Sequence, residues 1–142
     1  MKRYQDFAIL LLRAALGTGF LSAVSSRLRL LGSYSSGWGS FLAYAEKVNS
    51  FAPKNFIPAI AITATLTETL LALLLLFGYQ TRLASVGAAV LTFLFALAMW
   101  YSFGLKEPLD YSVFTFSMAA FLLSTVEKYR WSLDEIILKN SN

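Results

Sequence analysis

Two ionisable residues, Arg13 and Glu68, lie inside long apolar stretches of this sequence. Arg13 interrupts an apolar run near the N-terminus, and Glu68 lies within a second run rich in leucine and alanine. An unpaired charge in a hydrocarbon layer costs at least ~2.5 kcal/mol, so we expect both side chains to face protein and to pair with each other. Such a pair could hold a ligand or move a proton, or it could only fix the register of two helices.

Small and hydroxyl-bearing residues accompany the two charges at helical spacing. Gly17 lies four residues after Arg13, and Thr65 lies three residues before Glu68. Helix faces made of such residues let two helices approach closely, so packing alone would explain them. If the pair is functional, Gly17 and Thr65 belong to the same ligand-binding or proton-handling site.

Asp110 is a further acidic candidate, because it follows Pro108 and precedes another apolar run. Its carboxylate is placed to cap the free N–H groups at the start of a helix. Alternatively, Asp110 lies at the mouth of the candidate site. The sequence leaves both roles open.

Residue types that the sequence lacks exclude several kinds of chemistry. It contains no cysteine and no histidine, which removes disulfides, thiol redox centres, iron–sulfur ligation and the usual haem and zinc ligands. It also contains no phosphate-binding loop and no nucleophile–base motif, so we identify no catalytic residue. We expect no metal and no covalently bound cofactor, and any electron-transfer group must come from a partner or a diffusible quinone.

The composition indicates that a lipid bilayer is the solvent of these helices. Hydrophobic residues make up 57% and charged residues 14% of the chain, and the mean hydropathy is +0.60. A spanning helix needs about 20 apolar residues, and the stretches that approach this length are residues 7–24, 57–77, 83–101 and 111–126. The sequence therefore predicts a single transmembrane domain over residues 1–142, an all-α, antiparallel four-helix bundle.

Two shorter amphipathic segments accompany the predicted spans. Apolar residues from Phe41 to Ala52 recur at helical spacing in the long first loop. Near the C-terminus, Ser132 and Glu135 have capping-box spacing ahead of the apolar Ile136. We expect both segments to form short helices on the membrane surface.

Basic residues near the ends of the spans predict the orientation. An even number of spans places both termini on one side, which carries Lys2, Arg3, Arg82, Lys128, Arg130 and Lys139. The opposite side carries Arg27, Arg29, Lys47, Lys54 and Lys106. We predict cytoplasmic termini, because cytoplasmic loops carry the excess of basic residues. The scatter of these residues along loop ends indicates lipid headgroups rather than nucleic acid as their partners.

Three segments resemble those of a known family. They are Arg13-Ala14-Ala15-Leu16-Gly17-Thr18-Gly19-Phe20-Leu21, the stretch from Glu68 to Gly78-Tyr79-Gln80-Thr81-Arg82-Leu83-Ala84, and Trp131-Ser132-Leu133-Asp134. In this order they resemble the DoxX family of small four-helix bacterial membrane proteins. The sequence departs from the family pattern at Arg27, where lysine is common, and it lacks a histidine often found after the third helix.

The resemblance implies a bacterial inner-membrane protein linked to redox chemistry. Named members of the family include a small subunit of a thiosulfate:quinone oxidoreductase and membrane partners of thiol-stress enzymes. The chain would then be a non-catalytic or quinone-binding subunit that binds a quinone or docks a soluble oxidoreductase or another membrane subunit. The alternative is a non-enzymatic membrane scaffold or a small-solute transporter, for which four helices give room only in a homo-oligomer.

Overall fold

The computed structural model describes residues 2–140, and every regular element in this range is helical. The α-helices are α1 (Lys2–Arg27), α2 (Trp38–Val48), α3 (Ile57–Phe77), α4 (Thr81–Phe103), α5 (Lys106–Asp110), α6 (Val113–Ser124) and α7 (Leu133–Asn140). Two short 3-10 helices, η1 (Gly32–Tyr34) and η2 (Lys54–Phe56), lie in the first long connection. The predicted all-α class is confirmed.

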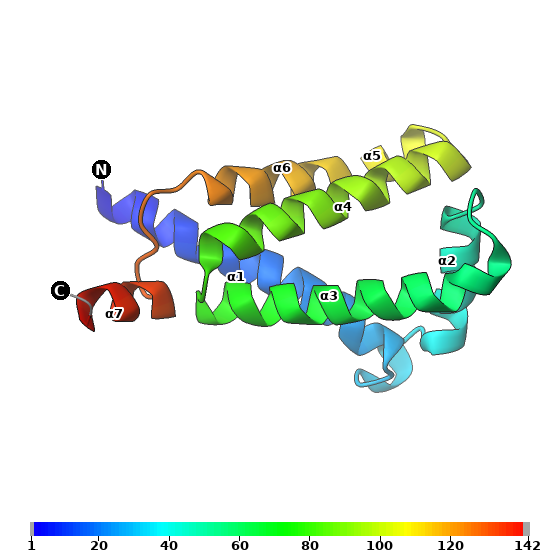
Figure 1. Ribbon diagram of the computed structural model, residues 1–142, viewed down its shortest axis with the longest axis horizontal. Coiled ribbons are helices and arrows are strands. Elements are labelled where there is room, and N and C mark those ends of the chain that lie inside the picture. The colour runs from blue at the N-terminus through cyan, green and yellow to red at the C-terminus, as the bar shows by residue number, and fades with distance from the viewer. Residues whose placement is uncertain (1, 141–142) are drawn as a thin grey trace.

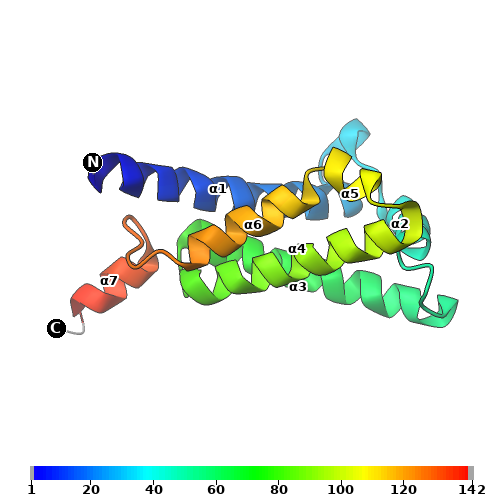
Figure 2. The same ribbon diagram turned by 90° about the horizontal axis from the view of Figure 1, so that it is seen from above.

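The long helices pack in two pairs. The first helix, α1, packs along α3, while α4 packs along α6, and the tight turn between α3 and α4 joins the pairs (Figure 1). The start of α1, the α3–α4 turn and α7 lie at one end of the molecule, and α2 and α5 lie at the other (Figures 1 and 2). Both described ends of the chain therefore lie at the same end of the molecule.

Three helices are long and apolar enough to cross a membrane. Within residues 2–140 they comprise Arg3–Arg27, Lys54–Phe77 and Thr81–Phe103, and the most apolar 18-residue stretches of these helices have mean hydropathies of 1.9, 2.1 and 2.1. The second predicted span, residues 57–77, has the bounds of α3. The first and third predicted spans are shorter than α1 and α4, because those helices continue through polar residues at both of their ends.

The fourth predicted span, residues 111–126, is longer than the helix found there. The helix α6 has 12 residues and is therefore about 18 Å long, against about 30 Å of hydrocarbon in a bilayer. The break precedes α6 at Ser112, whose φ of 54° places it in the left-handed region. Residues 106–124 thus form the short α5 and α6 instead of one continuous span.

Small residues form the contacts between the long helices. Ala72, Ala88 and Ala120 are completely buried, and Ser117 Oγ donates a hydrogen bond to the Ala89 carbonyl at 2.8 Å. These positions let backbones approach closely. The small residues of α3, α4 and α6 therefore form packing faces.

Gly17 is one of these close approaches, between α1 and α3. A Cβ on Gly17 would lie 2.7 Å from Leu76 Cγ and 3.2 Å from the Ala72 carbonyl oxygen. We expect Gly17→Ala to lower the free energy of unfolding by about 1–3 kcal/mol, because α1 must move away from α3. Thermal unfolding in detergent measures the effect. The control is Gly39→Ala in α2, where a Cβ meets nothing within 4 Å, and it should be neutral or slightly stabilising.

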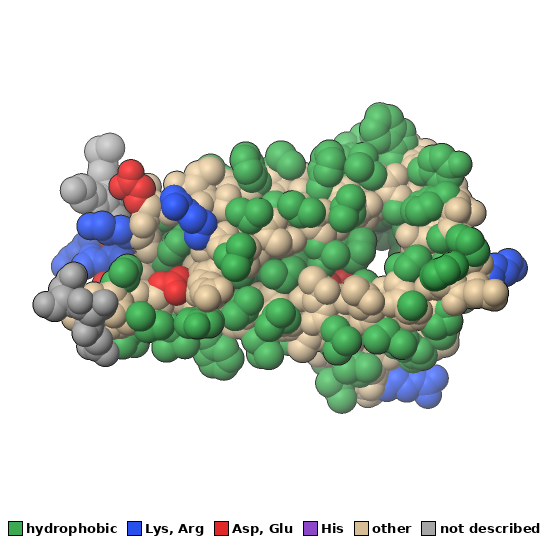
Figure 3. Space-filling model, viewed as in Figure 1, with side chains coloured by type: hydrophobic (Ala, Val, Ile, Leu, Met, Phe, Trp, Pro, Cys, Tyr) green, Lys and Arg blue, Asp and Glu red, His purple; other side chains and the backbone are tan. Residues whose placement is uncertain are grey.

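The sides of the molecule are apolar outside as well as inside. Figure 3 shows hydrophobic side chains over the middle of one face, with lysine and arginine side chains towards its ends. Large apolar side chains that are more than half exposed include Leu66, Leu70, Val90, Leu94, Phe121 and Leu122. An exposed apolar surface of this extent is typical of contact with lipid or with partner proteins.

Both predicted short helices are present. The helix in the first loop is α2, and it packs against α3 through Ala45, Ile57 and Ala61. The C-terminal one is α7, where Ser132 Oγ accepts a hydrogen bond from the Glu135 N–H at 3.2 Å, as the capping-box spacing predicts.

Candidate functional site

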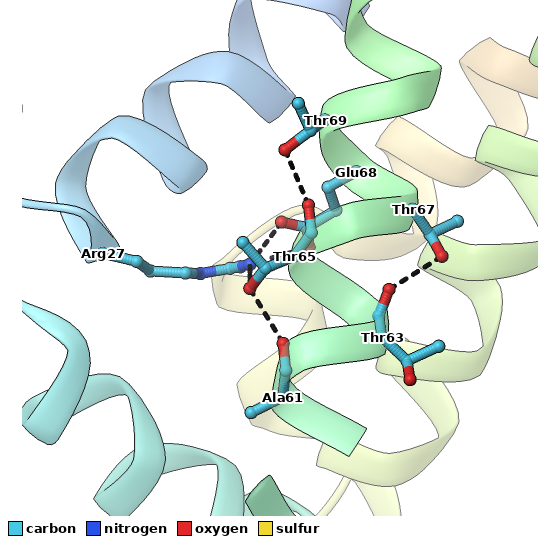
Figure 4. Close-up of polar contacts among 7 residues, drawn as sticks. All are labelled: Arg27, Ala61, Thr63, Thr65, Thr67, Glu68 and Thr69. Atoms are coloured by element: carbon cyan, nitrogen blue, oxygen red, sulfur yellow. Dashed lines mark hydrogen bonds and ion pairs between the residues drawn. The ribbon is translucent and has the colours of Figure 1, made fainter. Parts of the chain in front are cut away.

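The carboxylate of Glu68 is bound by the guanidinium of Arg27, the last residue of α1 (Figure 4). Arg27 Nη2 donates to Glu68 Oε1 at 3.1 Å, and Arg27 Nη1 donates to Glu68 Oε2. Two parallel hydrogen bonds between a guanidinium and a carboxylate are the strongest geometry for such a pair. The side chains of Arg27 and Glu68 are only 12% and 3% exposed, so the ion pair is nearly removed from solvent.

Thr65 and Phe41 complete the surroundings of Arg27. Arg27 Nη1 also donates to Thr65 Oγ1 at 3.3 Å, and that hydroxyl donates in turn to the Ala61 carbonyl at 2.8 Å. The guanidinium carbon lies 3.9 Å from the centroid of the Phe41 ring of α2, a cation–π contact. We call Arg27, Glu68, Thr65 and Phe41 the mid-helix cluster. It joins α1, α2 and α3 around one buried charge pair.

The predicted pair between Arg13 and Glu68 is wrong. Arg13 is 2% exposed, but its Nη2 donates to the Trp131 carbonyl at 2.7 Å, beside the C-terminal end of α3. The pair is wrong because α1 extends to Arg27, whereas the predicted first span ends at residue 24 and leaves Arg27 in the loop. Arg27 follows Arg13 by 14 residues, close to four turns of 3.6 residues, and this shared helix face is the signal that identifies it.

Arg13 instead belongs to a second group at the α3–α4 turn. The Asp134 carboxylate accepts hydrogen bonds from the backbone N–H groups of Gln80 at 2.7 Å and Thr81 at 2.8 Å. The Asp134 N–H donates to the Gly78 carbonyl at 2.9 Å. We call Arg13, Gly78, Gln80, Thr81, Trp131 and Asp134 the turn cluster. It brings together residues from all three segments that carry the family resemblance.

Gly17 and Asp110 lie outside both clusters. Gly17 packs against Leu76 and Ala72 and contributes close packing only. The Asp110 carboxylate accepts a hydrogen bond from Lys106 Nζ at 2.5 Å, and this exposed pair lies within α5. The predicted cap is wrong, because Ser112 is the N-cap residue of α6 and Asp110 is the last residue of α5.

A groove of about 680 Å³ opens between α3 and α4 at the end that carries α2 (Figure 3). Its walls are almost wholly apolar and include Ala64 and Thr67 of α3 and Leu94 and Tyr101 of α4. Ala64 lies one helical turn before Glu68, but the residues that line the groove include none of the mid-helix cluster, and Thr63 and Thr67 lie on the opposite side of α3 from Arg27 (Figure 4). The volume lies in the range of small-molecule binding sites, about 300–1,000 Å³.

A carboxylate next to the turn cluster gives a prediction about pH. The Trp131 N–H donates to Glu135 Oε2 at 2.9 Å, and this hydrogen bond lowers the pKa of Glu135 below its ordinary value. A carboxylate with a lowered pKa stabilises the folded state at any pH above the ordinary glutamate pKa of about 4.3, and this stabilisation is lost as the pH falls through the lowered pKa.

We therefore expect hydrogen exchange of the α7 amides, corrected for intrinsic rates, to speed up as pH falls below about 4. Glu135→Gln should exchange faster than wild-type protein above this pH and should lose the part of the pH dependence that Glu135 contributes, while the Asp134 contacts remain. Unchanged protection of α7 in wild-type protein across that range would contradict the assigned hydrogen bond.

Comparison with known proteins identifies one family. The DoxX family model matches residues 8–101, more than half of the chain. The matched range contains Arg13, Arg27 and Glu68 and the α3–α4 turn, while Trp131 and Asp134 lie beyond it. Neither the curated proteins nor the solved structures give a match.

Proposed function

We propose that this chain, which belongs to the DoxX family, is a membrane-spanning subunit of a redox complex that binds a quinone at the mid-helix cluster. The observation that carries the proposal is the buried Arg27–Glu68 pair, whose carboxylate comes from the middle of the apolar helix α3. Ionisable groups at such a depth are costly and usually functional. The family resemblance supports the quinone, and the buried ion pair supports the position of the site.

The membrane setting rests on the helices and on the outer surface. Three helices have the length and hydropathy of membrane spans, and large apolar side chains cover their outer faces. In a four-helix arrangement, α6 with α5 completes the bundle. Arg27 is one of the five basic residues that the sequence places on the α2 side, but it is buried and paired with Glu68. The excess of exposed basic residues on the side of the termini is therefore larger, which favours cytoplasmic termini in a bacterial inner membrane.

The residues of the mid-helix cluster match the polar head of a quinone. The guanidinium of Arg27 has more N–H groups than its bonds to Glu68 and Thr65 use, so it can donate to a carbonyl oxygen, and Thr65 holds it in place. Glu68 is the group that can take up or release a proton. The groove between α3 and α4 has apolar walls that suit a hydrocarbon tail. A quinone supplies two-electron chemistry, and the electrons must come from a partner protein because this chain has no cysteine or histidine.

Thermal unfolding with a short-chain quinone tests the proposal. Wild-type protein in detergent should be stabilised by the quinone, because a ligand that binds only the folded state raises the melting temperature. Thr65→Val should reduce this shift while the Arg27–Glu68 pair remains. The matched control is Glu46→Gln at an exposed ion pair with Lys54, which should keep the full shift. Absence of any shift, together with purified protein that carries no quinone, would refute quinone binding.

A non-enzymatic scaffold or solute transporter is the second candidate function. It is favoured by the complete pairing of Glu68, since both carboxylate oxygens already have donors from Arg27. A closed pair of this kind can act as a lock between α1 and α3. Proteoliposomes separate the two functions. A transporter moves solute without any redox partner, and with four helices it requires a homo-oligomer. The redox subunit shows no activity until an oxidoreductase and an electron donor are added.

A further inference from the structure

The turn cluster contains more hydrogen-bond donors than acceptors. Arg13 Nη1 and Thr81 Oγ1 are buried and have no hydrogen-bond partner among residues 2–140. The residues themselves are 2% and 0% exposed, so water outside the protein does not satisfy them. A buried polar group without a partner is costly, and such groups mark places where a further ligand or ordered water binds.

Both donors lie at the turn that precedes a long helix. Thr81 is the first residue of α4, a helix of 23 residues, and helix N-termini attract negative charge. Arg13 Nη1 lies beside the turn, 2.7 Å from the position that a Cβ on Gly78 would take. A guanidinium and a hydroxyl without partners, beside backbone N–H groups at the start of a helix, have the donor chemistry that binds an oxyanion.

Asp134 is the anion that the chain itself supplies to this place. Its carboxylate accepts the hydrogen bonds of the Gln80 and Thr81 N–H groups. Asp134 precedes Glu135 in the first turn of α7, a short helix whose residues Ile136, Ile137 and Leu138 are at least half exposed. Since little of α7 is buried, the binding of Asp134 is a large part of what holds α7 in place.

We infer that the α3–α4 turn with Arg13 is an oxyanion-binding site, and that Asp134 occupies it as a tethered ligand that an external carboxylate or phosphate can replace. This site is separate from the mid-helix cluster and does not depend on the quinone proposal. At the membrane surface, two sources offer the same chemistry: a free anion and the phosphate of a lipid headgroup. Replacement would release α7 and uncover Arg13.

Chemical rescue of Asp134→Ala tests the site. Removal of the carboxylate should lower the melting temperature in detergent, and acetate should restore most of the loss, whereas chloride at equal ionic strength should not. Arg13→Gln combined with Asp134→Ala should lose the rescue. Glu127→Ala, at an exposed acidic residue outside the cluster, should show no acetate effect. The inference would be overturned if Asp134→Ala folds but neither acetate nor phosphate raises its melting temperature.

Hydrogen exchange in the wild-type protein provides a test if Asp134→Ala does not fold. Rising phosphate should speed exchange at the α7 amides and leave α3 and α4 protected, because the external anion competes only with Asp134. Nanodiscs of phosphatidylglycerol and of phosphatidylcholine distinguish the two sources. Faster exchange of the α7 amides only in phosphatidylglycerol nanodiscs identifies the lipid headgroup as the ligand. Faster α7 exchange on addition of phosphate in both kinds of nanodisc identifies the free anion. Unchanged α7 exchange under all of these conditions contradicts the site.

Discussion

Replacing Glu68 with glutamine is expected to lower the free energy of unfolding by about 3–5 kcal/mol. The change removes the countercharge of Arg27 but leaves that guanidinium 12% exposed among α1, α2 and α3. Breaking a buried ion pair by removing one partner has this magnitude, because the remaining charge is neither solvated nor compensated. Unfolding by sodium dodecyl sulfate in mixed micelles measures the difference between the variant and wild type.

A double variant separates stability from function in the mid-helix cluster. Arg27→Met with Glu68→Leu replaces the pair with apolar side chains, which is often neutral or stabilising. We expect this variant to recover most of the stability lost in Glu68→Gln and to lose the thermal shift with quinone. Recovered stability with a full quinone shift would assign the pair a locking role only.

An exposed ion pair supplies the control for these charge changes. The pair between Lys106 and Asp110 has side chains that are 83% and 54% exposed. Exposed pairs of this kind contribute little, so Asp110→Asn should alter the free energy of unfolding by less than about 1 kcal/mol. A large loss in Asp110→Asn would mean that the assay reports general changes in charge, and it would remove the support for a buried pair.

Gly78→Ala is expected to have the second large effect, about 2–5 kcal/mol of lost stability. Gly78 has a φ of 67°, and its new Cβ would lie 2.5 Å from Ser132 Cβ and 2.7 Å from Arg13 Nη1. The left-handed backbone costs a residue with a side chain about 1–2 kcal/mol, and overpacking costs about 1–3 kcal/mol more. The Cβ of Ser132 cannot move without its backbone, so the C-terminal segment must shift away from the turn.

Gly32→Ala is the matched control for Gly78→Ala. Gly32 also has a positive φ, 58°, but a Cβ there meets nothing within 4 Å. This variant should lose only the backbone term of about 1–2 kcal/mol. Thermal unfolding compares the stabilities, and hydrogen exchange should show released α7 amides in Gly78→Ala alone. Equal losses in the two variants would contradict the close contact between the turn and Ser132.

The two clusters divide the buried charges of the protein between the middle of α3 and its C-terminal end. In the first, α1 delivers Arg27 to Glu68, and in the second, it delivers Arg13 to the segment that precedes α7. One long helix therefore ties together parts of the chain that are 41 and 118 residues apart. The Glu68 carboxylate compensates the charge of Arg27, whereas the Trp131 carbonyl takes only Nη2 of Arg13 and leaves its Nη1 without a partner among residues 2–140.

Much of the fold could be predicted from the sequence alone. Apolar stretches of the length of a membrane span identified three long helices, and the bounds of α3 were predicted correctly because Pro58 and Gly78 mark its two ends. Amphipathic spacing identified α2 and α7. The types of Arg13, Glu68 and Thr65 also indicated that they are buried, since a charge in such a segment must find protein.

The partners of the buried charges could not be predicted in this way. Pairing depends on how far α1 extends beyond its apolar run and on where it crosses α3, and an arginine side chain can bridge several ångströms in either direction. Sequence spacing shows on which face of its own helix a residue lies, but it does not show which residue of a neighbouring helix lies at the same height.

The sequence by itself therefore determined which residues must be buried, because hydropathy and charge are local properties of each segment. Only the tertiary structure decided that Glu68 binds Arg27 and that Arg13 binds the Trp131 carbonyl beside the α3–α4 turn. These contacts depend on the relative placement of segments far apart in the chain.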